Sequence, residues 1–138
     1  MPLSEHRYHR RVQFAETDMA GVVHFANFLR YMEEAEHALW REAGLSIVPP
    51  GSEIGFPRVA ASVEFHAPLY FEDEFEVHIR VAAISRRSIR YVSTIMRGDT
   101  KIASGTVTAV CVRNSPRPMR AIDLPGDIAG RFAVSDAV

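Results

Sequence analysis

The alternation of apolar and polar residues near the start of the chain predicts a strand followed by one long helix. Residues 8–14 alternate with a period of two, which favours a strand. Over residues 27–43, apolar side chains recur at three- and four-residue spacing, as on an amphipathic helix. This stripe consists of Phe28, Leu29, Met32, Ala35, Leu39, Trp40 and Ala43. Asn27 is a suitable N-cap for the helix, and Gly44 is a suitable C′ residue.

The rest of the chain has the two-residue period of strands. Further strands are predicted at residues 58–66, 74–84, 88–97 and 101–113. One face of the first carries Val59, Ala61, Val63 and Phe65, and one face of the second carries Phe75, Val77, Ile79 and Val81. The last two strands flank the turn Arg97-Gly98-Asp99-Thr100 and should form an antiparallel hairpin. The pattern then weakens, and residues 126–138 are expected to be a mobile tail.

This order of elements predicts an α+β layer with an incomplete surface. One helix covers only one face of a five-stranded sheet, so the other face stays uncovered. At least one edge strand also keeps unpaired backbone groups, which are a template for pairing with another chain. The pattern therefore predicts a homo-oligomer.

Composition narrows the class of protein. The 138 residues suit a single domain, 1–138, and the 16 Lys+Arg against 17 Asp+Glu argue against a nucleic-acid binder. A single cysteine, Cys111, excludes an internal disulfide. No apolar run is long enough to span a membrane, and residues 1–10 lack the apolar core of a secretory signal. A cytoplasmic location is expected, and nothing in the chain indicates a metal or redox cofactor.

Three segments carry a family resemblance. Residues 14–36 read FAETDMAGVVHFANFLRYMEEAE, residues 65–74 read FHAPLYFEDE, and Gly105 precedes Thr-Val-Thr. Together they resemble hotdog-fold acyl-CoA thioesterases of the 4-hydroxybenzoyl-CoA thioesterase family. The resemblance implies a five-stranded antiparallel sheet wrapped around one long helix, with two protomers joined edge to edge. It further implies an acyl-CoA substrate and a homodimer or homotetramer.

The resemblance also assigns roles within residues 18–25. Asp18 corresponds to the catalytic carboxylate, which acts as nucleophile or general base in thioester hydrolysis. The backbone N–H of Phe25 would polarise the thioester carbonyl, and Gly21 would permit close approach of the backbone. Spacing alone favours a structural role for Asp18, as an N-cap or Asx-turn residue beside Gly21.

Two neighbouring positions stay open between a catalytic or binding role and a structural one. His24 departs from the family pattern, in which some relatives carry a histidine at the position that Phe25 occupies here. Its imidazole could assist the attacking water or orient Asp18. Alternatively, it has a structural role or lines the substrate pocket. Asn27 is either a helix cap or a polar contact to the substrate.

Basic residues at a predicted turn suit the phosphates of CoA. Arg86, Arg87 and Ser88 lie between two strands and are candidate CoA-binding residues, with a solvated turn as the alternative. The helical pair Glu34 and His37 has the spacing of a di-iron motif, but a single pair in a mostly stranded chain indicates a solvated face. Cys111, within an apolar run, is expected to be a buried small hydrophobe.

Three functions compete at this point. Acyl-CoA hydrolysis is the leading hypothesis. A non-catalytic acyl-CoA binding or sensing protein would use the same scaffold. A hotdog dehydratase acting on 3-hydroxyacyl thioesters would need a histidine and a carboxylate from different protomers, and its His, Pro and Gly pattern is absent from the loop.

Overall fold

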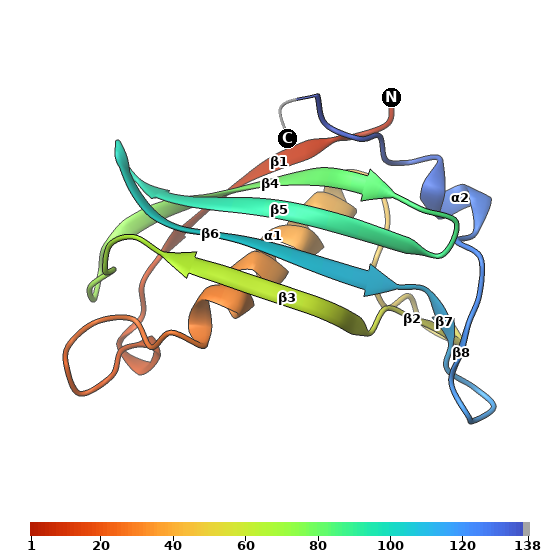
Figure 1. The fold of residues 1–138 in the computed structure, drawn as a ribbon, viewed down its shortest axis with the longest axis horizontal. Helices are drawn as coiled ribbons and strands as arrows, with labels where there is room; N and C mark the ends of the chain where they lie inside the picture. Colours follow the sequence, from red (N-terminus) through yellow and green to blue (C-terminus); the bar gives the residue numbers. More distant parts are fainter. Residues whose placement is uncertain (137–138) are drawn as a thin grey trace.

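A five-stranded antiparallel sheet wraps around one long helix in the computed structural model, which describes residues 1–136 (Figure 1). The strands follow the order β1-β4-β5-β6-β3, so β1 and β3 are the edges. This arrangement confirms the expected α+β hotdog fold. The elements are β1 (Glu5–Arg11), η1 (Phe14–Glu16), α1 (Asn27–Glu42), β2 (Ile54–Gly55), β3 (Arg58–Phe65), β4 (Glu74–Ile84), β5 (Ser88–Arg97), β6 (Thr100–Val110), β7 (Val112–Arg113), β8 (Arg120–Ala121) and α2 (Gly126–Ala129).

The helix α1 buries one face against the sheet, as its period predicts. The buried members of the expected stripe are Phe28, Met32, Ala35, Leu39 and Trp40. They pack against the inward face of the interior strand β4, where Phe75, Val77, Ile79 and Val81, predicted to share one face, are buried. The stripe is nevertheless rotated from the expected one. Leu29 remains exposed, while Tyr31 and the charged Glu36 are buried.

The ends of α1 match the prediction at one end only. Gly44 has a positive φ of 82°, which suits the expected C′ position after the helix. Asn27, expected as the N-cap, is instead the first helical residue, and Ala26 occupies the N-cap position without a side-chain cap. The Asn27 side chain is free of capping because it bonds to another segment, described below.

The first strand begins and ends earlier than predicted. β1 spans Glu5–Arg11, whereas the alternation suggested residues 8–14. The ladder with β4 stops at the pair Arg11–Glu74 because β4 begins there, so Phe14 starts the short turn η1 and is exposed. Tyr8 and Arg10 lie on the same face of β1, and both are half-buried.

The predicted hairpin is present, but its second strand is shorter than expected. β5 and β6 pair from Ser88–Val110 to Arg97–Thr100. After Val110 the chain leaves the main sheet, and β7 joins β2 and β8 in a separate three-stranded sheet. Cys111 is buried at this junction, and burial raises the pKa of its thiol, as suits a packing residue.

Strand β3 lies at an open edge of the main sheet and exposes apolar side chains. Val59 is 61% exposed and Phe65 is 53% exposed, although they share the predicted apolar face. The other edge differs, because β1 presents Arg7, His9 and Arg11 outward, each paired with Glu74 or Glu76 of β4.

The last segment packs against the core, in contrast to the expected mobile tail. Phe132 is buried with its ring centroid 5.3 Å from that of Trp40. Leu3 and Phe132 also form a parallel bridge, so the segment lies beside the start of the chain. The sequence signal for this contact is Phe132 itself, a single aromatic residue in a stretch of small and polar residues. Such an isolated residue has no periodic pattern to reveal its burial. Residues 137 and 138 lie outside the described residues.

The described residues were also compared with the requirements of a membrane-spanning helix and of a metal site. Within residues 1–136, no helix has both the length and the apolar character needed to cross a membrane. Across the same range, no three His, Cys, Asp or Glu side chains are grouped so that they could hold a metal ion. Glu34 of the di-iron-like pair instead contacts Arg10 and Tyr8.

Candidate active site

The loop between η1 and α1 carries most of the candidate catalytic residues. It folds back on itself through a bridge between Thr17 and Val23. It is tied to the β3–β4 connection, because the Val23 amide donates to the Leu69 carbonyl at 2.8 Å and Val22 forms a bridge with Tyr70. The loop therefore lies at the end of the sheet where β3 finishes (Figure 1).

The carboxylate of Asp18 is fixed by backbone hydrogen bonds and is accessible to solvent. Its Oδ1 accepts the Ala20 amide at 2.8 Å and the Val22 amide at 3.4 Å, which is the Asx-turn geometry. Gly21 completes the turn with a positive φ of 82°, a conformation that favours glycine. Asp18 itself is exposed to solvent. The turn geometry thus coexists with the catalytic hypothesis, since it fixes a carboxylate that a substrate can reach.

One backbone amide before α1 has no hydrogen-bond acceptor. The neighbouring amides are all occupied: His24 N–H donates to Glu16, Ala26 N–H to the His24 ring, and Asn27 N–H to the His24 carbonyl. Within the described residues, the Phe25 N–H has no such acceptor. It lies beside the N-terminus of α1, where the helix dipole favours negative charge. This amide is therefore available to bind an oxygen that gains negative charge.

The ring of His24 binds the backbone just before α1. Its Nδ1 accepts the Ala26 N–H at 3.2 Å, so in the neutral imidazole the proton resides on Nε2. The ring also stacks on Phe25, with centroids 4.6 Å apart. In this arrangement Nε2 can donate a hydrogen bond, and neither ring nitrogen is free to act as a base.

Asn27 links the helix to the segment that precedes Asp18. Its Nδ2 donates to the Glu16 carbonyl at 2.8 Å. The His24 amide donates to the same carbonyl at 2.9 Å, so both ends of the loop converge on Glu16. The Asn27 side-chain amide holds the loop against α1, a role that differs from the expected cap, and its contact with substrate stays a prediction.

A half-buried ion-pair network beneath the loop was missed by the sequence analysis. The guanidinium of Arg10 binds the Glu16 carboxylate through both terminal nitrogens and lies 2.7 Å from Glu34 through Nε. Tyr31 OH donates to Glu16 at 2.9 Å, and burial raises the pKa of that phenol. Burial alone would raise the pKa of Glu16, but Arg10, the Gln13 amide and Tyr31 together lower it. The signal in the sequence was Arg10, a charge on an inward-facing strand position.

A second missed feature is a cavity between α1 and the sheet. It has a volume of about 220 Å³ and is lined by Leu29, Met32, Glu33, Glu36, Arg58, Ala61, Ile79, Tyr91, Ser93 and Val107. Arg58 binds the buried Glu36 through both terminal nitrogens. Burial raises the pKa of Glu36 more than Arg58 lowers it. The periodicity of α1 gave no sign that this glutamate is buried.

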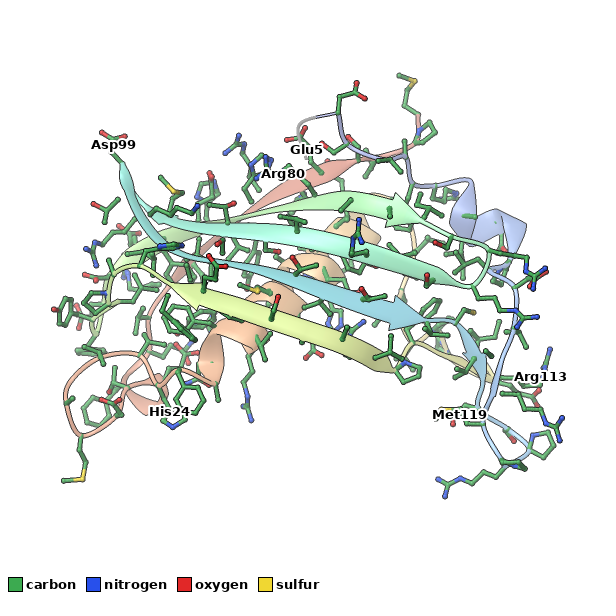
Figure 2. The ribbon with its side chains drawn as sticks, viewed as in Figure 1. Glu5, His24, Arg80, Asp99, Arg113 and Met119 are labelled. Carbon is green, nitrogen blue, oxygen red and sulfur yellow. The ribbon has the colours of Figure 1, made fainter. Side chains whose placement is uncertain are left out.

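The predicted CoA-binding residues lie far from Asp18 within one protomer. Arg86 and Arg87 are in the β4–β5 turn, where both pair with Asp123 at 3.2 and 3.1 Å. Ser88 begins β5 opposite Val110, at the end of the sheet where β3 begins. The Asp18 loop is at the other end, and Figure 2 shows the same separation between His24 and Arg113. β3 has 8 residues, so the ends are about 26 Å apart.

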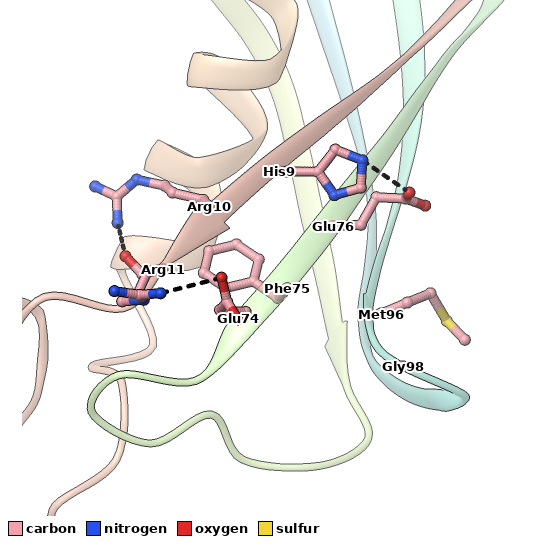
Figure 3. Close-up of a pocket in the computed structure, with 8 residues that line it drawn as sticks. All are labelled: His9, Arg10, Arg11, Glu74, Phe75, Glu76, Met96 and Gly98. Atoms are coloured by element: carbon pink, nitrogen blue, oxygen red, sulfur yellow. Dashed lines mark hydrogen bonds and ion pairs between the residues drawn. The ribbon is translucent and has the colours of Figure 1, made fainter.

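A surface hollow over β1 and β4 carries charged groups that pair with one another (Figure 3). It has a volume of about 540 Å³ and is open to solvent. His9 lies 3.5 Å from Glu76, and Arg11 lies 3.2 Å from Glu74. Because its charges are mutually neutralised, this hollow is a weaker candidate for a substrate site than the Asp18 loop.

The chain is similar to known thioesterases along most of its length. The model of the thioesterase-like superfamily matches residues 12–132. A relative from Aquifex aeolicus is 34% identical over 110 residues, which cover 78% of this chain and 84% of the relative. The structure of a 1,4-dihydroxy-2-naphthoyl-CoA thioesterase from Synechocystis has a TM-score of 0.84 at 26% identity, covering 93% of this chain and 95% of that one. A gentisyl-coenzyme A thioesterase structure has a TM-score of 0.82 at 30% identity, covering 93% and 100%.

The fold, the loop and these similarities define the class of protein. A five-stranded sheet wraps around one helix, and the loop that leads into that helix carries Asp18. The chain belongs to the thioesterase-like superfamily. The resemblance to hotdog acyl-CoA thioesterases that the sequence carries is thereby confirmed.

Proposed function

We propose that the protein hydrolyses an acyl-CoA thioester to the free acid and CoA, with Asp18 as the catalytic carboxylate. The observation that carries the proposal is the pairing, on one loop, of an exposed, fixed carboxylate with the unoccupied Phe25 N–H. Relatives are named for 1,4-dihydroxy-2-naphthoyl-CoA and gentisyl-CoA, so aromatic acyl-CoA thioesters are the first candidates.

The proposed mechanism begins at the thioester carbonyl. Its oxygen accepts the Phe25 N–H, which stabilises the negative charge that develops as the carbonyl carbon is attacked. Asp18 either attacks that carbon itself, giving a mixed anhydride that water then cleaves, or removes a proton from an attacking water. In both routes the C–S bond breaks and the CoA thiolate takes up a proton. Gly21 allows the close backbone approach, and His24 and Asn27 hold the loop.

We propose further that two copies pair through β3, giving a homodimer that can assemble into a homotetramer. The exposed apolar residues of β3 favour this edge, whereas the charged side chains of β1 disfavour the other. Antiparallel pairing about a two-fold axis would bring the start of one β3 beside the end of the other. Arg86, Arg87 and Ser88 of one protomer would then lie at the same end as the partner's loop and could bind the CoA phosphates.

The test is the substitution Asp18→Asn. The amide keeps an oxygen that can accept the Ala20 and Val22 N–H groups, so the loop should stay folded while the charge and basicity are lost. We expect kcat/KM on a panel of aliphatic and aromatic acyl-CoAs to fall by about 100-fold or more. Asp99→Asn, in the exposed β5–β6 turn, is the matched control and should leave activity unchanged.

The outcomes separate the competing functions. Retained activity in Asp18→Asn would remove this residue from the mechanism. Binding of acyl-CoA without release of free thiol would identify a binding protein instead. Formation of an unsaturated product from a 3-hydroxyacyl-CoA would identify a dehydratase.

A further inference from the structure

The loop around Asp18 is a short antiparallel ribbon with a defined register. The bridge between Thr17 and Val23 makes these two residues directly opposite neighbours. Next to the bridge, the Asp18 N–H donates to the Val22 carbonyl at 2.8 Å, so Asp18 lies opposite Val22. In such a ribbon, successive side chains of each arm project to opposite faces. The register therefore determines which side chains of the loop share a face.

Asp18 and His24 share the exposed face of this ribbon. Each is next to a residue of the bridged pair, so both project away from the face that carries Thr17 and Val23. The burial agrees, because Val23 is buried whereas Asp18 and His24 are exposed. With this register, Asp18 and His24 are diagonal neighbours, and such side chains are about 7–8 Å apart. A thioester carbonyl fits between a carboxylate and a ring at that separation.

The two nitrogens of the His24 ring have different surroundings. Nδ1 accepts the Ala26 N–H, so the neutral ring carries its proton on Nε2. Among residues 1–136, no group accepts a hydrogen bond from Nε2, and no carboxylate forms an ion pair with the ring. Protonation of Nδ1 would also break the bond to Ala26. The ring thus presents one N–H donor to solvent and is suited to the neutral form.

This donor lies beside the unoccupied Phe25 N–H. His24 and Phe25 are adjacent in the chain, and their rings stack with centroids 4.6 Å apart. An oxygen that accepts the Phe25 N–H would lie about 3 Å from that nitrogen, within reach of a donor on the preceding side chain. The stack and the bond to Ala26 restrain the imidazole, so the donor is oriented before a substrate binds.

We infer that the Nε2–H of His24 is a second hydrogen-bond donor to the thioester carbonyl oxygen, beside the Phe25 N–H, and that the imidazole acts there as a neutral group. The inference rests on the proposed thioesterase function and adds a catalytic residue to it. Negative charge develops on this oxygen as the carbonyl carbon is attacked, so both bonds strengthen in the transition state. The proton stays on Nε2 throughout. One ring nitrogen supports the loop, and the other stabilises the reacting oxygen.

Two substitutions separate the roles of the two nitrogens. In His24→Asn, the side-chain oxygen can replace Nδ1 as acceptor of the Ala26 N–H, but no donor remains at the position of Nε2. In His24→Gln, the longer side chain places an amide N–H near the position of Nε2, and the bond to Ala26 is lost. A structural role and a catalytic role of His24 therefore predict opposite orders of activity for the two variants.

The assay is thiol release from the acyl-CoA panel, with thermal melting of each variant. We expect kcat to fall by about 100-fold in His24→Asn, with KM and the melting temperature little changed. His24→Gln should keep kcat within about tenfold of the wild type, although it melts at a lower temperature. His9→Asn, exposed on the outer face of β1, is the matched control and should leave kcat unchanged. Nitrogen NMR, at a pH at which imidazole is neutral, should show the His24 proton on Nε2.

Three results would overturn the inference while thiol release persists in the wild type. The first is a kcat that falls at least as much in His24→Gln as in His24→Asn, because the bond to Ala26 would then be the part that matters. The second is a kcat that neither substitution changes, and the third is a proton on Nδ1. Failure of the proposed function gives a different result, namely a wild type that releases no thiol from any acyl-CoA, and the inference then falls with it.

Discussion

At the scale of single residues, the loop that carries Asp18 depends on Glu16, two positions earlier. The Glu16 side chain accepts bonds from Arg10, Tyr31 and the Gln13 amide, while its backbone carbonyl accepts Asn27. One glutamate therefore joins β1, η1 and α1 beneath the candidate site. Its substitution should loosen the loop without touching the substrate.

We expect Glu16→Gln to lower the free energy of unfolding by about 1–3 kcal/mol at pH 7, because hydrogen bonds to a charged group are lost. The pKa of Glu16 in the folded state lies below its ordinary value of 4.5. Its contribution is therefore present above that value and is lost as pH falls through the lower, folded pKa. The stability gap between wild type and variant, measured by urea unfolding, should shrink from pH 7 to pH 3.

The comparison needs a control for loss of charge alone. Glu64→Gln, an exposed position on β3, should show little change at either pH. A gap for Glu16→Gln that stays constant or widens on acidification would show that the carboxylate is not ionised and paired in the folded state.

At this scale the sequence predicted which candidate residues share one loop, but it did not predict the side chains that hold that loop in place. The motif around Asp18 placed the candidate carboxylate, Gly21, His24 and Phe25 on one loop, and the structure has them there. The network of Arg10 and Glu16, and the burial of Glu36, depend on contacts between distant segments. Periodicity assigns a face to each residue, but only the packed fold determines which charge meets which partner.

At the scale of elements, Gly105 sets the contact between α1, β6 and β3. A Cβ at this position would lie 2.7 Å from the Met32 Cε and 2.8 Å from the Ser62 carbonyl oxygen. The methionine can move, but the backbone of the neighbouring strand cannot move without shifting the sheet. The glycine is thus required by close packing and not by its φ angle.

We predict that Gly105→Ala lowers the free energy of unfolding by about 1–3 kcal/mol, the usual cost of overpacking a core. Adding Met32→Ala should relieve the strain only in part, because the contact with the Ser62 carbonyl remains. Gly126→Ala is the control, since a Cβ there has nothing within 4 Å. Thermal melting compares the stabilities of the three variants. A Gly105→Ala protein as stable as Gly126→Ala would contradict the prediction.

The elements themselves were largely predictable, because α1, β4, β5 and β6 have clear periods. The boundaries that moved are set by partners along the sheet: β1 ends where β4 begins, and β6 ends where the chain turns to β7. The apolar face of β3 was also read correctly but is largely exposed. An alternating pattern reports that a face is apolar and not which chain covers it.

At the scale of the whole molecule, the candidate catalytic loop and the candidate CoA-binding turn lie at opposite ends of each protomer. If two chains pair through β3, each site combines the loop of one with the turn of the other. A mixed dimer of Asp18→Asn with an Arg86→Ala, Arg87→Ala double variant then contains one intact site and one site lacking both parts.

We therefore expect mixed dimers, purified through two different affinity tags, to recover about half of the wild-type activity per dimer, since one of two sites is complete. Each parent homodimer should be impaired, the Asp18 variant in kcat and the arginine variant in KM. Activity of the mixed dimer equal to the mean of its parents would contradict a shared site.

The charged outer edge formed by β1 has a consequence for the size of such assemblies. Two five-stranded sheets joined through β3 would make one of ten strands, with a β1 at each border. The outward Arg7, His9 and Arg11, paired with glutamates of β4, leave no apolar strand for a third chain to extend. In the proposed assembly, growth in the plane of the sheet would therefore terminate at two chains, without open-ended fibres. A tetramer would then form by stacking one closed pair on another.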